Sequence, residues 1–449
     1  MGAAVSGCLF DSFEQAWKGW TTDHSTTAHP APKWSVSFMR ICLAFLIFVG
    51  SVSAFSQPSS VALTHVNVVD VRSGSVARDQ TVLIADGRIS AVSRSGSVHI
   101  PGGVRILDGQ GDFLIPGLWD MHVHTDGDRR ALQMMLAAGI TGIRDMGGDV
   151  HKLINARHNI EAGDWDGPRV IFAGPLLDGP PGDSDSESWV VRTPEEARRV
   201  VVSLAVLHVN FIKVHDRLAR DVYFTIAATA KREELPFAGH VPGTISPVEA
   251  SDAGQASIEH FEFVPKQCLP VLNAMVVGEN PGLKECTHES FDALFEHFAK
   301  NGTWLVPTIQ SFRYFAPAQW TQILANFSEL GGQMRNAHVQ MMAGTDWSDY
   351  LESKGAHPGG CLHDELGIWV DAGFTPLQAL QASAVNPALF LGMQDSLGSV
   401  KKGYIADLVL LKDNPLLDIR NTTHIVAVVA RGKVYDHAAL IGLGRTEGR

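Results

Sequence analysis

Positive charge is scarce in this chain of 449 residues. The chain has 36 lysines and arginines against 48 aspartates and glutamates, a formal net charge of −12 at pH 7, and no basic run. Proteins that bind nucleic acids neutralise phosphates with lysine and arginine. The composition therefore argues against a nucleic acid partner, and a small molecule is the expected substrate.

A hydrophobic run long enough to span a membrane is missing as well. The fully apolar stretch at residues 41–49 is shorter than the ~20 residues that a span needs. Met39 and Arg40 precede it and small residues lead to Ala54, an order typical of a secretory signal peptide. We expect residues 1–54 to be an extension with a signal peptide at 39–54, a true start at Met39, cleavage after Ala54, and a secreted or periplasmic protein. An uncleaved anchor is the alternative, and only that case predicts membrane association.

Cysteine is rare, with five in the chain, and two of them fall in the segment expected to be removed. Cys268, Cys286 and Cys361 remain. In an oxidising compartment Cys268 and Cys286 can close a local loop and leave Cys361 free. Three unrelated buried thiols are the alternative.

The chain contains 45% hydrophobic residues, and its 43 glycines are spread along its length. This composition is typical of a globular α/β protein. Short runs of alternating apolar residues occur near both ends, and Asp86-Gly87 between two such runs is a hairpin signal. We expect residues 55–115 and 393–449 to form one small β-sandwich domain together.

Between these ends, strand-like runs alternate with helical stretches. Three helix starts carry an N-cap hydroxyl, proline at the first helical position and Glu or Gln at the third, beginning at Thr193, Ser246 and Thr375. Eight alternations over residues 116–392 predict a (β/α)8 TIM barrel with its active site at the C-terminal ends of the strands. The predicted strands are residues 118–124, 139–145, 169–174, 210–215, 236–241, 256–261, 303–309 and 342–346.

Candidate metal ligands occur at the ends of five of these strands. His122 and His124 share a face of the first strand, because side chains alternate along a strand. The others are Lys213, His240, His260 and Asp346 on the fourth, fifth, sixth and eighth strands. Each residue alone is more often structural, but their convergence on one end of a barrel predicts a metal site.

With these motifs the chain resembles the amidohydrolase superfamily, in its imidazolonepropionase-like and Xaa-Pro-dipeptidase-like branch. The resemblance covers residues 61–435 and rests on PGLWDMHVH, FIKV, GHV, IEHF, AGTD and GYIADLVLLKDNPL, in the family's order. It implies a binuclear centre beside the family's small companion domain. In that centre His122, His124 and Asp346 hold one divalent ion, His240 and His260 hold the other, and Lys213, carboxylated by CO2, bridges both.

The chemistry of the side chains agrees with that assignment. Neutral imidazoles and carboxylates suit Zn2+, whereas an ammonium group cannot bind a cation, so Lys213 fits only as a carbamate. The alternative is a mononuclear site with Lys213 beside it. We expect Asp346 to be catalytic as well, taking a proton from a metal-bridged hydroxide and passing it to the leaving amine.

Three further residues are candidates for contact with the substrate. His215 lies two residues after the bridging lysine, and Arg313 and Tyr314 follow the seventh strand, where Arg313 offers a bidentate fork to a carboxylate. The loop at residues 176–192 carries four acidic residues, among them Asp178. We expect it to be either a rim that prefers neutral or cationic substrates or a solvated surface loop.

The sequence thus predicts a metal-dependent hydrolase that cleaves a C–N bond of a dipeptide or an N-acyl amino acid. The same ligands suit an esterase, lactonase or phosphotriesterase. A non-catalytic binding protein on this scaffold is a third reading, which the complete set of ligands disfavours. The sequence does not decide whether the protein forms a homo-oligomer.

Overall fold

The computed structural model describes residues 60–182, 184–261, 263–264 and 286–444. Residues 56–449 form one compact unit, and the boundaries predicted at 115/116 and 392/393 stay predictions. The predicted signal segment and its cleavage site lie outside the described residues, as does Cys268. Cys286 is disulfide-bonded, whereas Cys361 is a buried free thiol.

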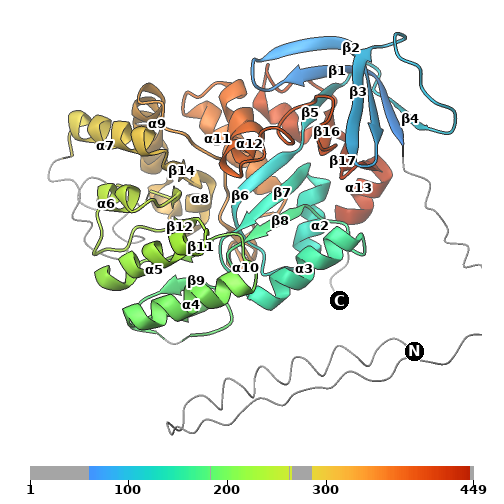
Figure 1. Cartoon of the computed structure of the whole chain (residues 1–449). Coiled ribbons are helices and arrows are strands. Elements are labelled where there is room, and N and C mark those ends of the chain that lie inside the picture. Colours follow the sequence, from blue (N-terminus) through green and yellow to red (C-terminus); the bar gives the residue numbers. More distant parts are fainter. Residues whose placement is uncertain (1–59, 183, 262, 265–285, 445–449) are drawn as a thin grey trace, which may run out of the picture. The chain divides into compact units, whose positions relative to one another are not determined.

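Both ends of the chain contribute to one eight-stranded sheet (Figure 1). Its strands are β1 (Val61–Asp70), β2 (Ser75–Ala85), β3 (Arg88–Arg94), β4 (Arg105–Asp108), β5 (Phe113–Pro116), β16 (Leu408–Leu411), β17 (Ile425–Ala430) and β18 (Lys433–Asp436). The order is β18-β17-β16-β5-β1-β2-β3, with β4 beside β1. Leu114 of β5 lies opposite Leu410 of β16, so this antiparallel pair joins the two ends. Because all eight strands belong to one sheet, the predicted sandwich stays a prediction.

The turn between β2 and β3 follows the sequence signal. Ala85 pairs with Arg88, and the two residues between them, Asp86 and Gly87, have φ of 52° and 73°. Positive φ at both positions defines the type I′ turn, whose twist matches that of the flanking strands. The predicted hairpin is therefore present.

Ten short strands form two further sheets, in which all pairs are parallel. One has the order β15 (Trp347–Ser348), β6 (Leu118–His124), β7 (Ile140–Asp145), β8 (Arg169–Phe172). The other has the order β10 (Ser188–Val190), β9 (Leu176–Asp178), β11 (Ile212–Val214), β12 (Phe237–Gly239), β13 (Ser257–Glu259), β14 (Trp304–Val306).

Backbone hydrogen bonds link strands of these two sheets to segments that lie between the sheets. Asn210 donates to Phe172 of β8, Leu305 of β14 donates to Gln340, and Met121 of β6 donates to Ala343. These bonds are of the kind that a continuous ring of strands requires. The fold is mixed α/β with parallel sheets, and closure into a TIM barrel stays a prediction.

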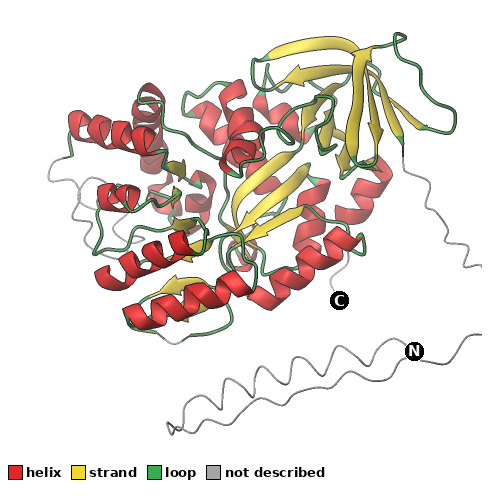
Figure 2. Cartoon of the chain, in the orientation of Figure 1, coloured by secondary structure: helices red, strands yellow, loops and turns green. Residues whose placement is uncertain are grey.

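Helices follow most of the parallel strands and lie around them (Figure 2). They are α2 (Arg129–Ala137), α3 (Val150–Ala162), α4 (Pro194–Val206), α5 (Arg220–Arg232), α6 (Pro247–Asp252), α7 (His288–Asn301), α8 (Phe312–Phe315), α9 (Trp320–Asn336), α10 (Asp349–Ser353), α11 (Gly360–Asp371), α12 (Pro376–Phe390) and α13 (His437–Gly444), with 3-10 turns η2 (Ile309–Ser311), η3 (Pro317–Gln319) and η4 (Ile419–Thr423). Helices α4, α6 and α12 begin at the three predicted starts. Thr193, Ser246 and Thr375 each accept a backbone N–H, and the last two form complete capping boxes.

The strand predicted at residues 342–346 is absent, which is a correction. The backbone N–H groups of Thr345 and Asp346 both bond to the carbonyl of His122, and Asp346 has φ of 56°. Two residues opposite one partner interrupt a ladder as a bulge does. Regular pairing with β6 therefore begins only at Trp347.

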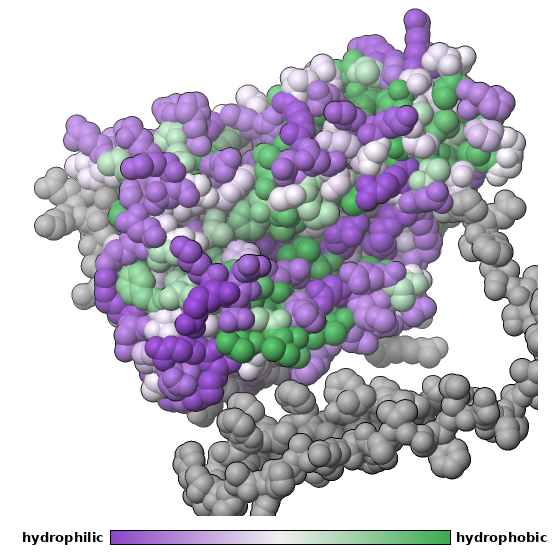
Figure 3. Space-filling view, viewed as in Figure 1, coloured by the Kyte–Doolittle hydropathy of each residue, from purple (hydrophilic) through white to green (hydrophobic). Residues whose placement is uncertain are grey.

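No helix among the described residues is long and apolar enough to cross a membrane. On the face shown in Figure 3 the described surface is mostly hydrophilic, and hydrophobic residues reach it in limited patches. The large exposed hydrophobic side chains include Val202 and Val206 of α4.

Candidate metal centre

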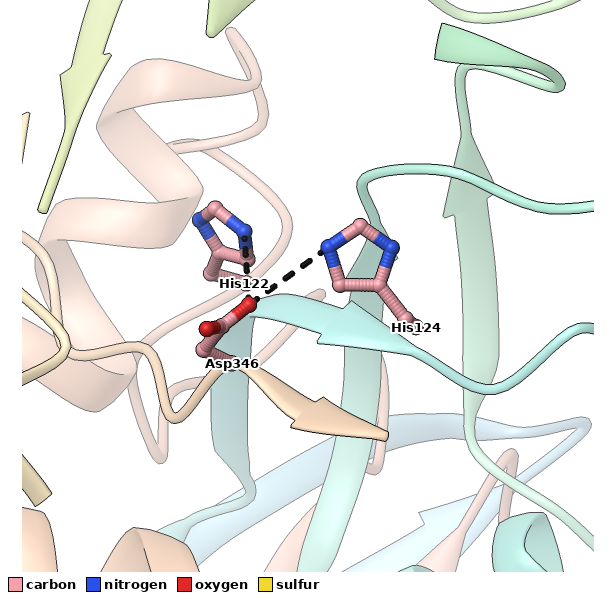
Figure 4. A group of neighbouring side chains, drawn as sticks. All are labelled: His122, His124 and Asp346. Atoms are coloured by element: carbon pink, nitrogen blue, oxygen red, sulfur yellow. Dashed lines mark ion pairs between the residues drawn. The ribbon is translucent and has the colours of Figure 1, made fainter. Parts of the chain in front are cut away.

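His122, His124 and Asp346 meet at the end of β6 (Figure 4). Asp346 Oδ1 lies 3.4 Å from His122 Nε2 and 3.5 Å from His124 Nε2. The alternation of β6 directs both imidazoles to one side, and the backbone bond from Asp346 to His122 places the carboxylate opposite them. These three residues have the spacing that a metal ion needs.

The other predicted ligands lie next to these three residues. The ring centroid of His260, just after β13, lies 4.7 Å from that of His122 and 4.9 Å from that of His240, which follows β12. Lys213 is buried on β11, and burial first, with the charge of a Lys213 ammonium in addition, lowers the pKa of all four imidazoles. The structure thus brings the six predicted residues together, and their roles as ligands stay a prediction.

Each of the four imidazoles has its Nδ1 atom against an oxygen. The pairs are His122 with Glu259 (2.7 Å), His124 with the Gly147 carbonyl (3.0 Å), His240 with Asp216 (2.6 Å) and His260 with Thr308 (2.6 Å). An imidazole that donates from Nδ1 carries its lone pair on Nε2, as metal-binding histidines do. Carboxylate and carbonyl oxygens only accept, so His122, His124 and His240 present the Nε2 lone pair that a metal requires, and the Thr308 hydroxyl allows His260 to do the same.

Sequence reasoning missed these supporting oxygens. Glu259 directly precedes His260 in the sequence yet hydrogen-bonds to His122, which lies on another strand. Asp216 similarly follows His215 and hydrogen-bonds to His240. The acidic neighbours of the predicted ligands were the only available signal, and it does not say which histidine each carboxylate contacts.

Two buried atoms in the group lack hydrogen-bond partners among the described residues, His122 Nε2 and Lys213 Nζ. A buried polar atom without a partner is costly and needs an explanation. A divalent ion would satisfy the imidazole nitrogen, and a carbamate on the lysine would supply the anionic ligand that the ammonium cannot. The donor set therefore fits divalent metal ions.

Burial also sets the protonation of the group. It is the main cause that lowers the pKa of the four imidazoles, to about 3 for His124, so all four are neutral near pH 7. Burial likewise lowers the pKa of the Lys213 ammonium, which favours the amine form that CO2 can carboxylate. It raises the pKa of Asp346 to about 7. A group of neutral donors with a proton-accepting carboxylate is what metal-assisted hydrolysis uses.

His215 lies beside these ligands. Its ring centroid is 4.2 Å from that of His240, and its Nδ1 is 3.3 Å from Asp178 Oδ2. Arg217 donates to Asp178 from Nε at 2.8 Å and from Nη2. Asp178 is therefore a fully buried residue of β9, and not part of an exposed rim or loop. His215, Asp216 and His240 are also close enough for a metal, although the bond from His240 to Asp216 accounts for that carboxylate as an orienting group.

Arg313 and Tyr314 lie on α8 and have contacts outside the group of six predicted ligands. Arg313 Nη1 is 3.3 Å from Asp364 Oδ2, and the guanidinium lies 5.0 Å from the ring centroid of Trp320. Tyr314 packs against the hydrophobic core. Their predicted contact with a substrate carboxylate stays a prediction.

Known proteins are similar to this chain in sequence and in fold. The amidohydrolase family profile matches residues 113–435. An ochratoxinase from Aspergillus niger is 26% identical over 377 residues, which cover 68% of this chain and 72% of that protein. An adenine deaminase from Clostridium botulinum (strain Loch Maree / Type A3) is 22% identical over 395 residues, 84% of this chain and 58% of that protein. A putative prolidase from Bifidobacterium longum has the same fold, with a TM-score of 0.68 and 24% identity over 86% of this chain and 98% of that one. The chain therefore belongs to the amidohydrolase family, as its motifs predict, and is a hydrolase that acts on carbon–nitrogen bonds.

Proposed function

We propose that this protein hydrolyses the amide bond of a dipeptide or an N-acyl amino acid with two divalent ions, most suitably Zn2+. The observation that carries the proposal is the set of four neutral imidazoles held through Nδ1 around Lys213 and Asp346. The prolidase and ochratoxinase names of similar proteins support an amide substrate. We also propose a secreted or periplasmic location, on the signal-like sequence alone.

The residues divide into two halves around a shared ligand. His122, His124 and Asp346 would hold one ion, His240 and His260 the other, and Lys213 as a carbamate would bridge them. Bound there, the ions would polarise the substrate carbonyl and lower the pKa of water. The backbone hydrogen bonds from β6 and β14 to residues 340–343 and from Asn210 to β8 support a closed barrel that would carry these residues at its C-terminal end.

Asp346 supplies the proton transfer that amide cleavage needs. An amine is a poor leaving group until its nitrogen is protonated. Asp346 Oδ1 lies 3.4 and 3.5 Å from Nε2 of the two imidazoles of β6, where it would take a proton from water and then give it to nitrogen. His215, a quarter exposed beside His240, would contact the substrate.

The test is a substrate screen with purified zinc-loaded protein. The panel contains Xaa-Xaa dipeptides, N-acyl amino acids, and the ester and lactone counterparts of the best amides. We expect two ions per chain and the highest kcat/KM on an amide. Higher kcat/KM on the esters or lactones would replace the proposal with an esterase or lactonase, and absence of turnover with both ions bound would favour a binding protein.

A further inference from the structure

A fully buried ion pair lies directly behind His122. It consists of Arg144 on β7 and Glu259 on β13, whose side chains are 1% and 0% exposed. Arg144 Nη2 donates to both oxygens of Glu259, at 2.9 and 3.0 Å. We call these two residues the Arg144–Glu259 bridge.

The bridge connects strands of both parallel sheets. Arg144 Nε donates to the carbonyl of Met121 on β6 at 2.7 Å, and its Nη1 donates to the hydroxyl of Ser257 on β13 at 2.9 Å. Apolar rings surround the guanidinium, with centroids of Phe211 and Phe390 at 5.5 and 5.1 Å. The arginine is therefore fixed by several bonds in a region without solvent.

Glu259, which is held by Arg144, in turn contacts His122. Its Oε2 atom accepts from Arg144 and lies 2.7 Å from Nδ1 of His122. The opposite nitrogen of that imidazole is the buried Nε2 that lacks a hydrogen-bond partner among the described residues. The sequence of contacts is thus guanidinium, carboxylate, imidazole and candidate metal position.

Stability alone is a weak explanation for such a pair. Removing two charges from water is expensive, and apolar side chains of similar size often stabilise a protein as well as a buried ion pair does. A carboxylate behind a metal-binding imidazole, in contrast, orients the ring and makes its free nitrogen a stronger ligand.

We propose that Arg144 and Glu259 are positioning residues that set the affinity of His122 for its metal ion. Glu259 keeps the proton of His122 on Nδ1, and Arg144 keeps Glu259 in place. The inference rests on the proposed metal centre.

The direction in which one substitution changes the affinity for zinc separates this role from simple electrostatics. Arg144 is a cation close to a position for another cation, so by Coulomb's law alone its removal should tighten metal binding. If Arg144 acts by holding Glu259 against His122, its removal should weaken binding instead. We expect the second outcome for Arg144→Met, with zinc bound 10–100-fold more weakly, the usual effect of losing such support.

The experiment titrates metal-free full-length protein with Zn2+ in bicarbonate buffer against a chromophoric chelator. The variants are Arg144→Met, Arg144→Lys and Glu259→Gln. Arg169→Met is the control, because Arg169 at the start of β8 pairs with Asp407 and contacts no predicted ligand. Arg144→Lys keeps a cation that can reach Glu259 and should bind zinc with intermediate affinity, which keeps the test valid if the methionine variant does not fold.

A second readout follows the imidazole itself. Nitrogen-15 NMR of labelled histidines in the metal-free protein should show a protonated Nδ1 at His122 in the wild type and a mixture of tautomers in Glu259→Gln. Zinc affinity equal to or tighter than wild type in Arg144→Met overturns the inference. A wild-type protein that binds no zinc overturns the proposed metal centre and the inference together.

Discussion

His122 and His240 are both supported by a carboxylate, but in different surroundings. The pair of His122 with Glu259 is 0% exposed on both sides, and Arg144 balances the charge of the carboxylate. The pair of His240 with Asp216 is 12% and 10% exposed, and the nearest arginine in sequence, Arg217, binds Asp178 instead. Within the first half only His122 and its carboxylate are dry, because His124 and Asp346 are 25% and 14% exposed. The carboxylate behind His240 is therefore the one of the two supports that we expect water to reach.

Lys213→Ala should have the largest effect, because Lys213 as a carbamate would serve both halves. We expect loss of most of the bound metal and activity, measured by elemental analysis and amide turnover. Short carboxylic acids should restore part of the activity by taking the place of the carbamate. Lys152→Ala, which removes an exposed lysine paired with Asp126, is the matched control. Two bound ions and normal turnover in Lys213→Ala would contradict the bridging role.

Asp346→Asn should come next and should act in the half of the centre that contains His122. The amide keeps a neutral oxygen for the metal but removes the base, so amide turnover should fall by ~10²–10⁴-fold. The fall should be smaller for an activated ester, since its leaving group needs no proton. Equal losses on both substrates would leave Asp346 as a ligand only, and unchanged amide turnover would remove it from the mechanism.

A comparison of Asp216→Asn with Glu259→Gln tests the carboxylate behind His240 against the carboxylate behind His122. Both substitutions remove the carboxylate behind one imidazole, for which a loss of about 10–100-fold in metal affinity is typical. Because water can partly replace Asp216, we expect its variant to lie at the low end of that range. Chelator competition on both variants measures the difference. A greater loss for Asp216→Asn would show that water does not replace its carboxylate.

Asp178→Asn should have the smallest effect on turnover and a visible effect on stability. Burial raises the pKa of Asp178, but hydrogen bonds from His215 and Arg217 outweigh it, and the net pKa is lowered. A carboxylate with a lowered pKa stabilises the fold above its unfolded pKa of about 3.9, and this stabilisation is lost as the pH falls through the folded value.

We therefore expect Asp178→Asn to lower the free energy of unfolding by about 1–3 kcal/mol at pH 7, the scale of charged hydrogen bonds. The difference from wild type should shrink below about pH 4. Urea unfolding at pH 7 and at pH 3.5 measures both values. An equal difference at the two pH values would show that the charge of Asp178 does not contribute.

Much of the fold could be predicted from local signals. The caps at Ser246 and Thr375 and the turn at Asp86-Gly87 depend on a few adjacent residues, and the structure contains them. The strand predicted at residues 342–346 failed because the backbone of Asp346 adopts a positive φ that apolar patterning does not encode.

The candidate site likewise has a part that the sequence predicts and a part that it does not. His122 and His124 share a face because of strand alternation, which sequence spacing reveals. That Glu259 supports His122 rather than its own neighbour His260 depends on how β13 and β6 face each other across the interior. Asp178 was assigned to a loop because the short strand β9 has only three residues and no distinctive pattern. Contacts between distant strands are therefore the part that a single sequence does not reveal.

The pairing of β5 with β16 has a consequence for how the protein is made. Strand β5 ends at Pro116, just before β6, and its partner β16 is synthesised roughly 300 residues later. Until the ribosome has completed that late segment, the strand that leads into His122 has its neighbour β1 on one side but none on the other, and contacts this distant in sequence form slowly. Nascent chains that end before residue 408 should expose an unpaired apolar edge at β5, so chaperones would be needed at this stage of biosynthesis rather than by the finished enzyme.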